Sequence, residues 1–60
     1  MAGRRRKWWV CCSKFAIQVN TDENGRITFA APIAKKFMGQ PLQNLLRWAE
    51  ALGGFHYTEL

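Results

Sequence analysis

The clearest secondary-structure signal lies in KFAIQVNTDENGRITFAAP, residues 14–32. Apolar residues alternate with small or polar ones on both sides of an Asn-Gly pair, and this period of two is typical of half-buried strands. A three-residue loop, residues 23–25, would give Gly25 the positive φ that a bulged turn needs, and it would pair Val19 with Phe29. We therefore predict an antiparallel hairpin with its apolar residues on one face.

The first strand of this hairpin extends towards the N-terminus, because the alternation continues backwards from Phe15. We predict one long strand over about residues 8–20, in which Trp9 and Cys11 face the core. Apolar residues also occupy its opposite face, and a strand that is apolar on both faces must be covered twice. We expect that face, with a tryptophan of a following helix, to form the interface with a dimer mate or another protein. The residues of this predicted interface are Trp8, Val10, Cys12 and Trp48.

Two prolines mark the starts of two helices after the hairpin. The first is predicted over residues 32–38, ended by Gly39, and the second over residues 41–52, where leucines and alanines form one apolar stripe. Residues 55–59 alternate weakly and are predicted as a third strand. The predicted fold class is therefore α+β, with strands at about 8–20, 26–31 and 55–59 in a small antiparallel sheet that packs with both helices. A chain of 60 residues buries a modest share of its surface, so we expect it to dimerise.

The net charge of +5 is concentrated at the N-terminus. Residues 1–14 carry five cations and no acid, whereas the four cations and four acids of residues 15–60 cancel. We expect residues 1–7 to form a flexible basic arm ahead of a single domain, residues 8–60. This asymmetry indicates a polyanionic partner, either nucleic acid or an anionic membrane. No amphipathic helix follows the arm to enter a membrane surface, so we expect no membrane partner.

A nucleic-acid partner, DNA or RNA, suits this arm. Its cations would neutralise phosphates and release counterions, which makes binding strongly salt-dependent. A neighbouring tryptophan, Trp8 or Trp9, would stack on the bases of a single strand, or the arginines could instead enter a minor groove. The alternative is a solubilising tail in front of two core tryptophans. The predicted nucleic-acid-binding residues are Arg4, Arg5, Arg6, Lys7, Trp8, Lys14, Arg26, Lys35 and Lys36.

The chain offers little chemistry for an enzyme or a metal site. Cys11 or Cys12 could pair with His56 as nucleophile and base, but 60 residues leave little room for an oxyanion site and a substrate cleft. The same three residues supply one ligand too few for a structural zinc ion. We therefore expect no enzymatic activity, no cofactor and no metal. The adjacent cysteines are interpreted as reduced thiols, which predicts a cytoplasmic protein.

Residues 19–39, VNTDENGRITFAAPIAKKFMG, combine a strand, an acidic turn, Gly-Arg-Ile, a proline and a short basic helix ended by glycine. The residues that carry this pattern are Asp22, Gly25, Arg26, Ile27, Pro32 and Gly39. The segment resembles the half-repeat of the AbrB-type transition-state regulators and antitoxins. This resemblance implies a swapped-hairpin dimer that binds DNA through basic residues near the turn, here Arg26 with help from Lys35 and Lys36. The proline and the last glycine fall later than in the family pattern, and the helix over 41–52 stands where the family has another hairpin.

Two functions follow as hypotheses. The first is non-enzymatic nucleic-acid binding by a small regulatory or accessory protein, of a size that phages and mobile elements encode, whose N-terminal Arg/Lys arm grips phosphates. The alternative is a protein-interaction module, either an inhibitor or a small subunit of a larger assembly such as a nucleoprotein, that docks through its apolar strand face and Trp48. A free dimer that binds oligonucleotides would favour the first hypothesis, and a protein that aggregates without a partner would favour the second.

Overall fold

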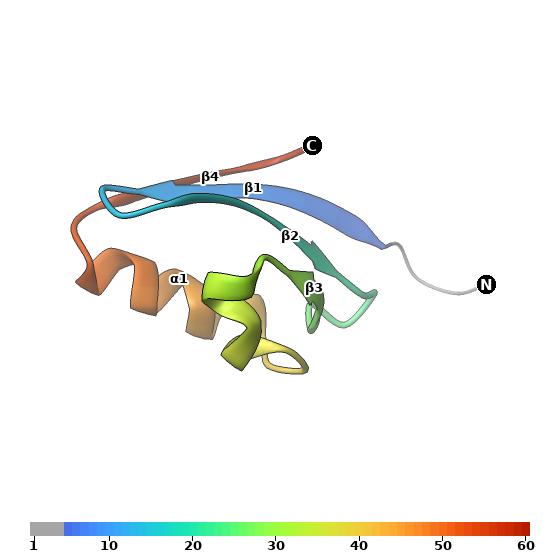
Figure 1. Ribbon diagram of the computed structural model, residues 1–60. Coiled ribbons are helices and arrows are strands. Elements are labelled where there is room, and N and C mark those ends of the chain that lie inside the picture. Colours follow the sequence, from blue (N-terminus) through green and yellow to red (C-terminus); the bar gives the residue numbers. More distant parts are fainter. Residues whose placement is uncertain (1–4) are drawn as a thin grey trace.

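The computed structural model describes residues 5–60, which form a four-stranded antiparallel sheet and two helical segments (Figure 1). The elements in chain order are β1 (Arg6–Cys12), β2 (Ala16–Thr21), β3 (Ile27–Ala30), the 3-10 helix η1 (Pro32–Phe37), α1 (Leu42–Ala51) and β4 (Phe55–Glu59). The strand order is β3-β2-β1-β4. The predicted α+β fold is confirmed, including both helices and the C-terminal strand.

Both helical segments lie on the same face of the sheet (Figure 1). Leu45 and Ala49 are four residues apart, so they share one side of α1, and both are fully buried. They complete a core whose buried apolar residues are Val10, Ile17, Val19, Ile27, Ala30, Ala34, Leu45 and Ala49. No helix within residues 5–60 covers the opposite face of the sheet (Figure 1). The sheet therefore has a covered face, which bears these core side chains, and an open face.

The C-terminal end of α1 is held against the turn between β1 and β2. Ser13 Oγ donates a hydrogen bond of 2.8 Å to the carbonyl oxygen of Leu52. Gly53 follows with a φ of 118°, and a Cβ at this position would lie 2.6 Å from Ser13 Oγ. Glycine is needed here for both its backbone conformation and its lack of a side chain.

The predicted long strand over residues 8–20 is wrong, because this segment contains two strands that pair as a hairpin. The backbone N–H of Cys12 donates to the carbonyl oxygen of Phe15 at 2.8 Å, and Cys11 lies opposite Ala16. Ser13-Lys14 therefore forms a two-residue connection without glycine, asparagine or proline. Because both faces of β1 carry apolar residues, the odd-numbered alternation of β2 could be continued through Ser13 into β1, and this hid the turn.

The predicted orientation of β1 is also wrong. Residues that lie opposite each other in a ladder share a face, and Val10 lies opposite Ile17. A connection of two residues thus reverses odd and even positions between the strands, so Trp8, Val10 and Cys12 belong to the covered face. Val10 is fully buried, so it has no exposed surface to offer to the predicted interface. Trp9 and Cys11, predicted to face the core, lie on the open face.

The hairpin of β2 and β3 is present with the predicted three-residue loop, next to which Thr21 pairs with Ile27, and its register differs from the prediction only beyond this pair. Gly25 has a φ of 80°, as predicted for the turn. Val19, however, pairs with Ala30 instead of Phe29, because a bulge leaves Thr28 without a partner on β2. This extra residue turns the Phe29 side chain to the open face.

Candidate nucleic-acid interface

The open face carries side chains from all four strands. The ladder partners and the strand alternation assign to it Lys7, Trp9, Cys11, Ala16, Gln18, Asn20, Phe29, His56 and Thr58. Two of these are large exposed aromatic residues, Trp9 at 43 % and Phe29 at 49 % of their accessible surface. The set contains one cation, one histidine, two amides, one hydroxyl and no acidic side chain. The open face is therefore apolar at two points and bears no acidic side chain, and the chain end at Leu60 lies next to Lys7, whose carbonyl oxygen accepts the Leu60 N–H at 2.8 Å.

Trp9 and Phe29 belong to adjacent cross-strand rows of the open face. Trp9 lies opposite Gln18 on β2, and the next row places Lys7 opposite Asn20 and Asn20 opposite Phe29. Gln18 Nε2 donates a hydrogen bond of 3.1 Å to Asn20 Oδ1, which ties the two amides together. The two rings are thus separated by a pair of amide side chains with a lysine beside them.

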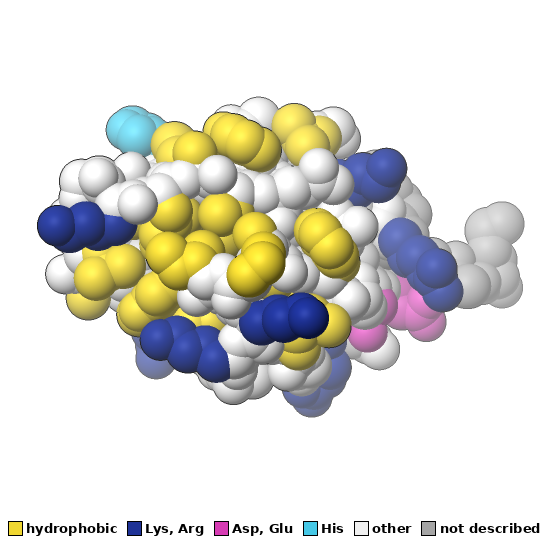
Figure 2. Space-filling view, viewed as in Figure 1, with side chains coloured by type: hydrophobic (Ala, Val, Ile, Leu, Met, Phe, Trp, Pro, Cys, Tyr) yellow, Lys and Arg dark blue, Asp and Glu magenta, His cyan; other side chains and the backbone are white. Residues whose placement is uncertain are grey.

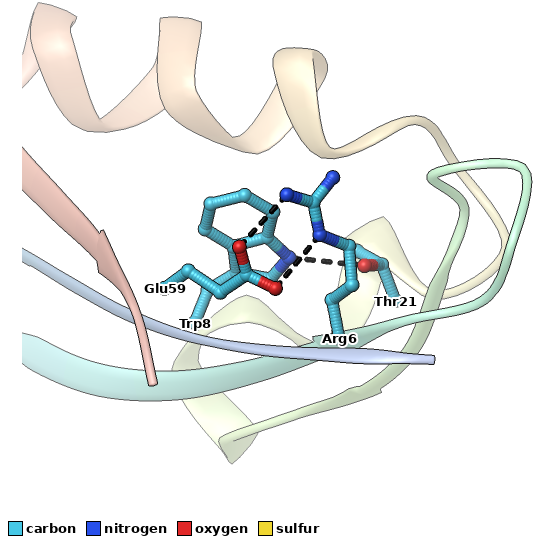
Figure 3. Close-up of polar contacts among 4 residues, drawn as sticks. All are labelled: Arg6, Trp8, Thr21 and Glu59. Carbon is cyan, nitrogen blue, oxygen red and sulfur yellow. Dashed lines mark hydrogen bonds and ion pairs between the residues drawn. The ribbon is translucent and has the colours of Figure 1, made fainter. Parts of the chain in front are cut away.

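Trp8, the tryptophan predicted to bind nucleic acid, lies on the covered face (Figure 3). Its Nε1 donates a hydrogen bond of 3.0 Å to Thr21 Oγ1, a hydroxyl on β2 that is almost completely buried. The Trp8 ring centroid lies 5.8 Å from the Tyr57 ring centroid. The Arg6 guanidinium carbon lies over the Trp8 ring, 4.9 Å from its centroid. These contacts make Trp8 a packing residue of the chain itself.

Arg6 is engaged by a carboxylate on the neighbouring strand (Figure 3). Its Nε and Nη2 donate to the two oxygens of Glu59 at 2.8 and 2.7 Å, which is a bidentate ion pair between β1 and β4. The Glu59 hydrogen bond and negative charge raise the pKa of the Arg6 guanidinium. Arg6 therefore has its charge matched within the chain, and Lys7 is the cation that β1 presents on the open face.

The boundary between the N-terminal arm and the domain lies earlier in the chain than predicted. Arg6 and Lys7, expected in the flexible arm, lie in β1 opposite Thr21 and Asn20. Arg5 directly precedes the strand and is exposed, and Arg4 lies outside the described residues. The sheet thus starts two residues before the predicted domain boundary.

Lys35 and Lys36 lie in η1, in the helical layer on the far side of the sheet from the open face. Lys36 Nζ lies 4.5 Å from the ring centroid of Trp48, close enough for a cation–π contact. The same tryptophan stacks on Phe15 at 5.1 Å and contacts Phe37 at 5.2 Å. Trp48, predicted at the partner interface, thereby closes the side of the core. Figure 2 shows hydrophobic side chains between the two layers with Lys and Arg around them.

The remaining predicted cations are separated from each other. Lys14 is exposed in the connection between β1 and β2, at one end of the sheet. Arg26 lies beyond the turn between β2 and β3, where its Nη1 donates to the carbonyl oxygen of Gly39 at 3.3 Å. The structure therefore does not bring the predicted cations into one patch.

Asp22 organises the turn between β2 and β3. Its Oδ1 accepts backbone hydrogen bonds from Arg26 at 2.9 Å and from Asn24 at 2.8 Å. These bonds, that from Arg26 foremost, and the positive charge of Arg26 lower the pKa of the Asp22 carboxyl group. The acidic side chains visible in Figure 2 lie at this end of the molecule, away from the histidine on the open face.

The two cysteines lie on different faces of the sheet. Cys11 is opposite His56 on the open face, whereas Cys12 faces the core and its Sγ accepts the backbone N–H of Lys14 at 3.4 Å. Within residues 5–60, no three or more histidine, cysteine or acidic side chains gather in a group that could hold a metal ion. The same residues enclose no pocket.

Comparisons with known proteins give no match. No protein-family model matches the chain, and neither curated proteins nor solved structures show significant similarity to it. In the described chain, no helix has the length and apolar character needed to cross a membrane.

Lys7 and Trp9 were named from the sequence as candidate contacts, but the exposed face that Trp9 shares with Phe29 was not predicted. Trp9 was assigned to the core, and Phe29 was paired with a core residue of β2. The available signal was the apolar character of both faces of β1, and within residues 5–60 no helix covers one of these faces. An unmarked connection at Ser13-Lys14 and a bulge at Thr28 decided which face that is.

Proposed function

We propose that this protein is a non-enzymatic nucleic-acid-binding protein, a small regulatory or accessory protein of the kind that phages and mobile elements encode. The observation that carries the proposal is the open face, a surface without acidic side chains that bears Lys7 and lies next to the exposed Arg5 in the chain. The N-terminal cations would contact phosphates, with Lys7 at the point where that segment joins the sheet. Arg6 contributes less in this proposal, because Glu59 already matches its charge.

The distribution of charge supports a polyanionic partner. The excess of +5 lies in residues 1–14, and the one acid of β4, Glu59, is bound by Arg6. A phosphate chain that approaches the open face therefore meets positive charge and no opposing carboxylate. Each cation that neutralises a phosphate releases a counterion, which makes the free energy of binding depend on salt concentration.

The resemblance to the AbrB-type half-repeat supports a second way of contacting DNA. In that arrangement Arg26, Lys35 and Lys36 would contact the phosphates of a duplex. These residues lie near the β2–β3 turn and in the helical layer, so the two arrangements use different surfaces of the molecule. Substitutions can therefore distinguish them.

The second candidate function is a protein-interaction module or homodimer. It is favoured by β4, which pairs with β1 on one side and has no strand partner on its other side within residues 5–60. Four of its five residues are exposed. An open strand edge can accept a strand from a second copy or another protein. In this proposal the edge of β4 replaces Val10 and Cys12 as the docking surface.

A cytoplasmic location stays a prediction.

The test is the salt dependence of binding to fluorescein-labelled single-stranded and duplex oligonucleotides, followed by fluorescence anisotropy between about 50 and 200 mM salt. We expect log K to fall linearly with log salt concentration. An Arg5→Gln/Lys7→Gln double variant should reduce the slope by about 1.4 to 1.8, since each lost phosphate contact accounts for about 0.7 to 0.9.

The matched control is an Arg26→Gln/Lys35→Gln double variant, which removes the same net charge elsewhere. Its slope should equal that of the wild type. A loss of slope in the control variant alone would assign binding to the surface that the AbrB resemblance implies. Absence of binding to every oligonucleotide at the lowest salt concentration would contradict nucleic-acid binding and leave the interaction-module function.

A further inference from the structure

We propose that the open face binds single-stranded nucleic acid by stacking unpaired bases on Trp9, with Phe29 as a second stacking position. This inference rests on the proposed function and adds to it the class of nucleic acid and the residues that contact its bases. Of the two tryptophans considered for stacking, Trp8 is packed within the protein, so the role falls to Trp9.

The first observation is the difference among the aromatic residues. The chain has eight Phe, Trp and Tyr residues, and six of them contact another aromatic ring in the structure. Trp9 and Phe29 are the two with no ring contact within residues 5–60, and both lie on the open face. Leaving two large rings about half exposed costs hydrophobic free energy that burial would recover, which is typical of a binding surface.

The second observation is the spacing of the two rings. Adjacent strands lie about 4.8 Å apart and residues rise about 3.4 Å along a strand, so the backbones of Trp9 and Phe29 are separated by roughly 12 Å. A few nucleotides of an extended single strand can span this distance. Lys7 shares a cross-strand row with Phe29 and is two residues from Trp9, so its ammonium group is placed for a phosphate between the two bases.

The third observation is the polar surface between the rings. The side chains of Gln18 and Asn20 bond each other through one donor and one acceptor. No other side-chain hydrogen bond within residues 5–60 engages the side-chain oxygen of Gln18, Oε1, or the side-chain NH₂ group of Asn20. These groups can accept hydrogen bonds from the edge of a base and donate to it. A partner with an apolar surface would leave them unpaired.

Single strands fit this face better than duplexes. In a duplex each base is stacked on its neighbours, so its flat surface is inaccessible to an aromatic side chain. The open face is a sheet surface, and no helix within residues 5–60 projects from it to enter a groove (Figure 1). An aromatic side chain on a sheet can instead receive an unpaired base on its ring.

Charge favours a nucleic acid over an acidic or neutral peptide as the occupant. None of the open-face residues carries a carboxylate, and Glu59 on the covered face is bound by Arg6. The other acids lie in the β2–β3 turn and on α1. The open face of a second copy would likewise offer no acidic side chain to match Lys7, whereas a phosphate matches it.

The experiment compares three labelled probes of equal length by fluorescence anisotropy: an oligothymidylate of about 12 nucleotides, the corresponding abasic oligonucleotide and a duplex. The abasic probe keeps the phosphates and lacks the bases. We expect the oligothymidylate to bind most tightly. Trp9→Thr should weaken oligothymidylate binding by about 5- to 150-fold and leave binding of the abasic probe unchanged.

Three further variants separate stacking from structural effects. Trp9→Phe keeps a ring and should retain most of the affinity, and Phe29→Thr should give a smaller loss than Trp9→Thr. Ile33→Thr, at a half-exposed residue of η1, is the matched control and should bind as the wild type does. Circular dichroism checks that each variant is folded.

The outcomes distinguish this inference from the proposed function. If the abasic probe binds as tightly as the oligothymidylate, or if Trp9→Thr has no effect, base stacking is overturned while phosphate binding stands. Tighter binding of the duplex also overturns it. Failure to bind any probe contradicts the proposed function as a whole. A dimer in sedimentation velocity that Trp9→Thr converts to a monomer would assign the open face to a second copy.

Discussion

Trp8 and Trp9 are adjacent in the chain and lie on opposite faces of β1. Trp8 donates a hydrogen bond to Thr21, lies next to Tyr57 and carries the Arg6 guanidinium over its ring. Trp9 has none of these kinds of contact and leaves 43 % of its surface exposed. Two identical side chains thus serve different purposes because strand geometry points successive residues to opposite faces. The covered face packs against the helical layer, and the open face has no covering helix within residues 5–60.

The largest expected difference between the faces is their tolerance of a charge. Val10→Asp should unfold the protein, because an unpaired carboxylate in the fully buried position costs several kcal/mol, much of the stability of a small domain. Cys11→Asp places the same group on the open face and should change the free energy of unfolding by less than about 1 kcal/mol. Urea denaturation followed by circular dichroism measures both. Similar losses in the two variants would contradict the assignment of faces.

A smaller effect is expected from the hydrogen bond that holds Trp8. Thr21→Val keeps the shape of the side chain and removes the acceptor of the Trp8 Nε1–H, so we expect a loss of about 1 to 2 kcal/mol. Thr28→Val is the matched control, because Thr28 is exposed and unpaired at the bulge. Its free energy of unfolding should stay within about 0.5 kcal/mol of the wild type. Equal effects of the two substitutions would show that the Trp8 bond contributes nothing.

The smallest expected effect is the pH dependence of stability that Asp22, in the β2–β3 turn, produces. Hydrogen bonds lower the pKa of Asp22 in the folded state, so the folded protein binds its proton more weakly than the unfolded chain. The resulting stabilisation is complete above the ordinary pKa of aspartate, about 4, and is lost as the pH falls through the lowered value. The Tm difference between wild type and Asp22→Asn should therefore shrink below about pH 4. A difference that is constant with pH would contradict a role for the charge.

Much of the fold could be predicted from sequence patterns. The β2–β3 hairpin, both helices and β4 were predicted because their signals are local: alternation around Asn-Gly, prolines at helix starts and an apolar stripe on α1. The faces of β1 could not be predicted in the same way. Both its faces are apolar, and the Ser13-Lys14 connection has none of the strongest turn residues, glycine, proline and asparagine.

The candidate interface was predicted less well, for the same physical reason. An error of one residue in register moves every side chain of a strand to the other face. The two-residue connection after Cys12 and the bulge at Thr28 each produced such an error, and together they hid Trp9 and Phe29. The position of the charge excess was readable from composition, whereas the ion pair between Arg6 and Glu59 required the pairing of β1 with β4.

The most direct test of the open face uses the three tryptophan indole N–H signals in a ¹⁵N–¹H correlation spectrum. Trp9→Phe and Trp48→Phe assign the signals, and unlabelled oligothymidylate is then titrated into the wild-type protein. We predict that the Trp9 signal shifts progressively while those of Trp8, bonded to Thr21, and Trp48, stacked on Phe15, stay in place. A titration that saturates with the Trp8 or Trp48 signal displaced and the Trp9 signal unmoved would contradict the account.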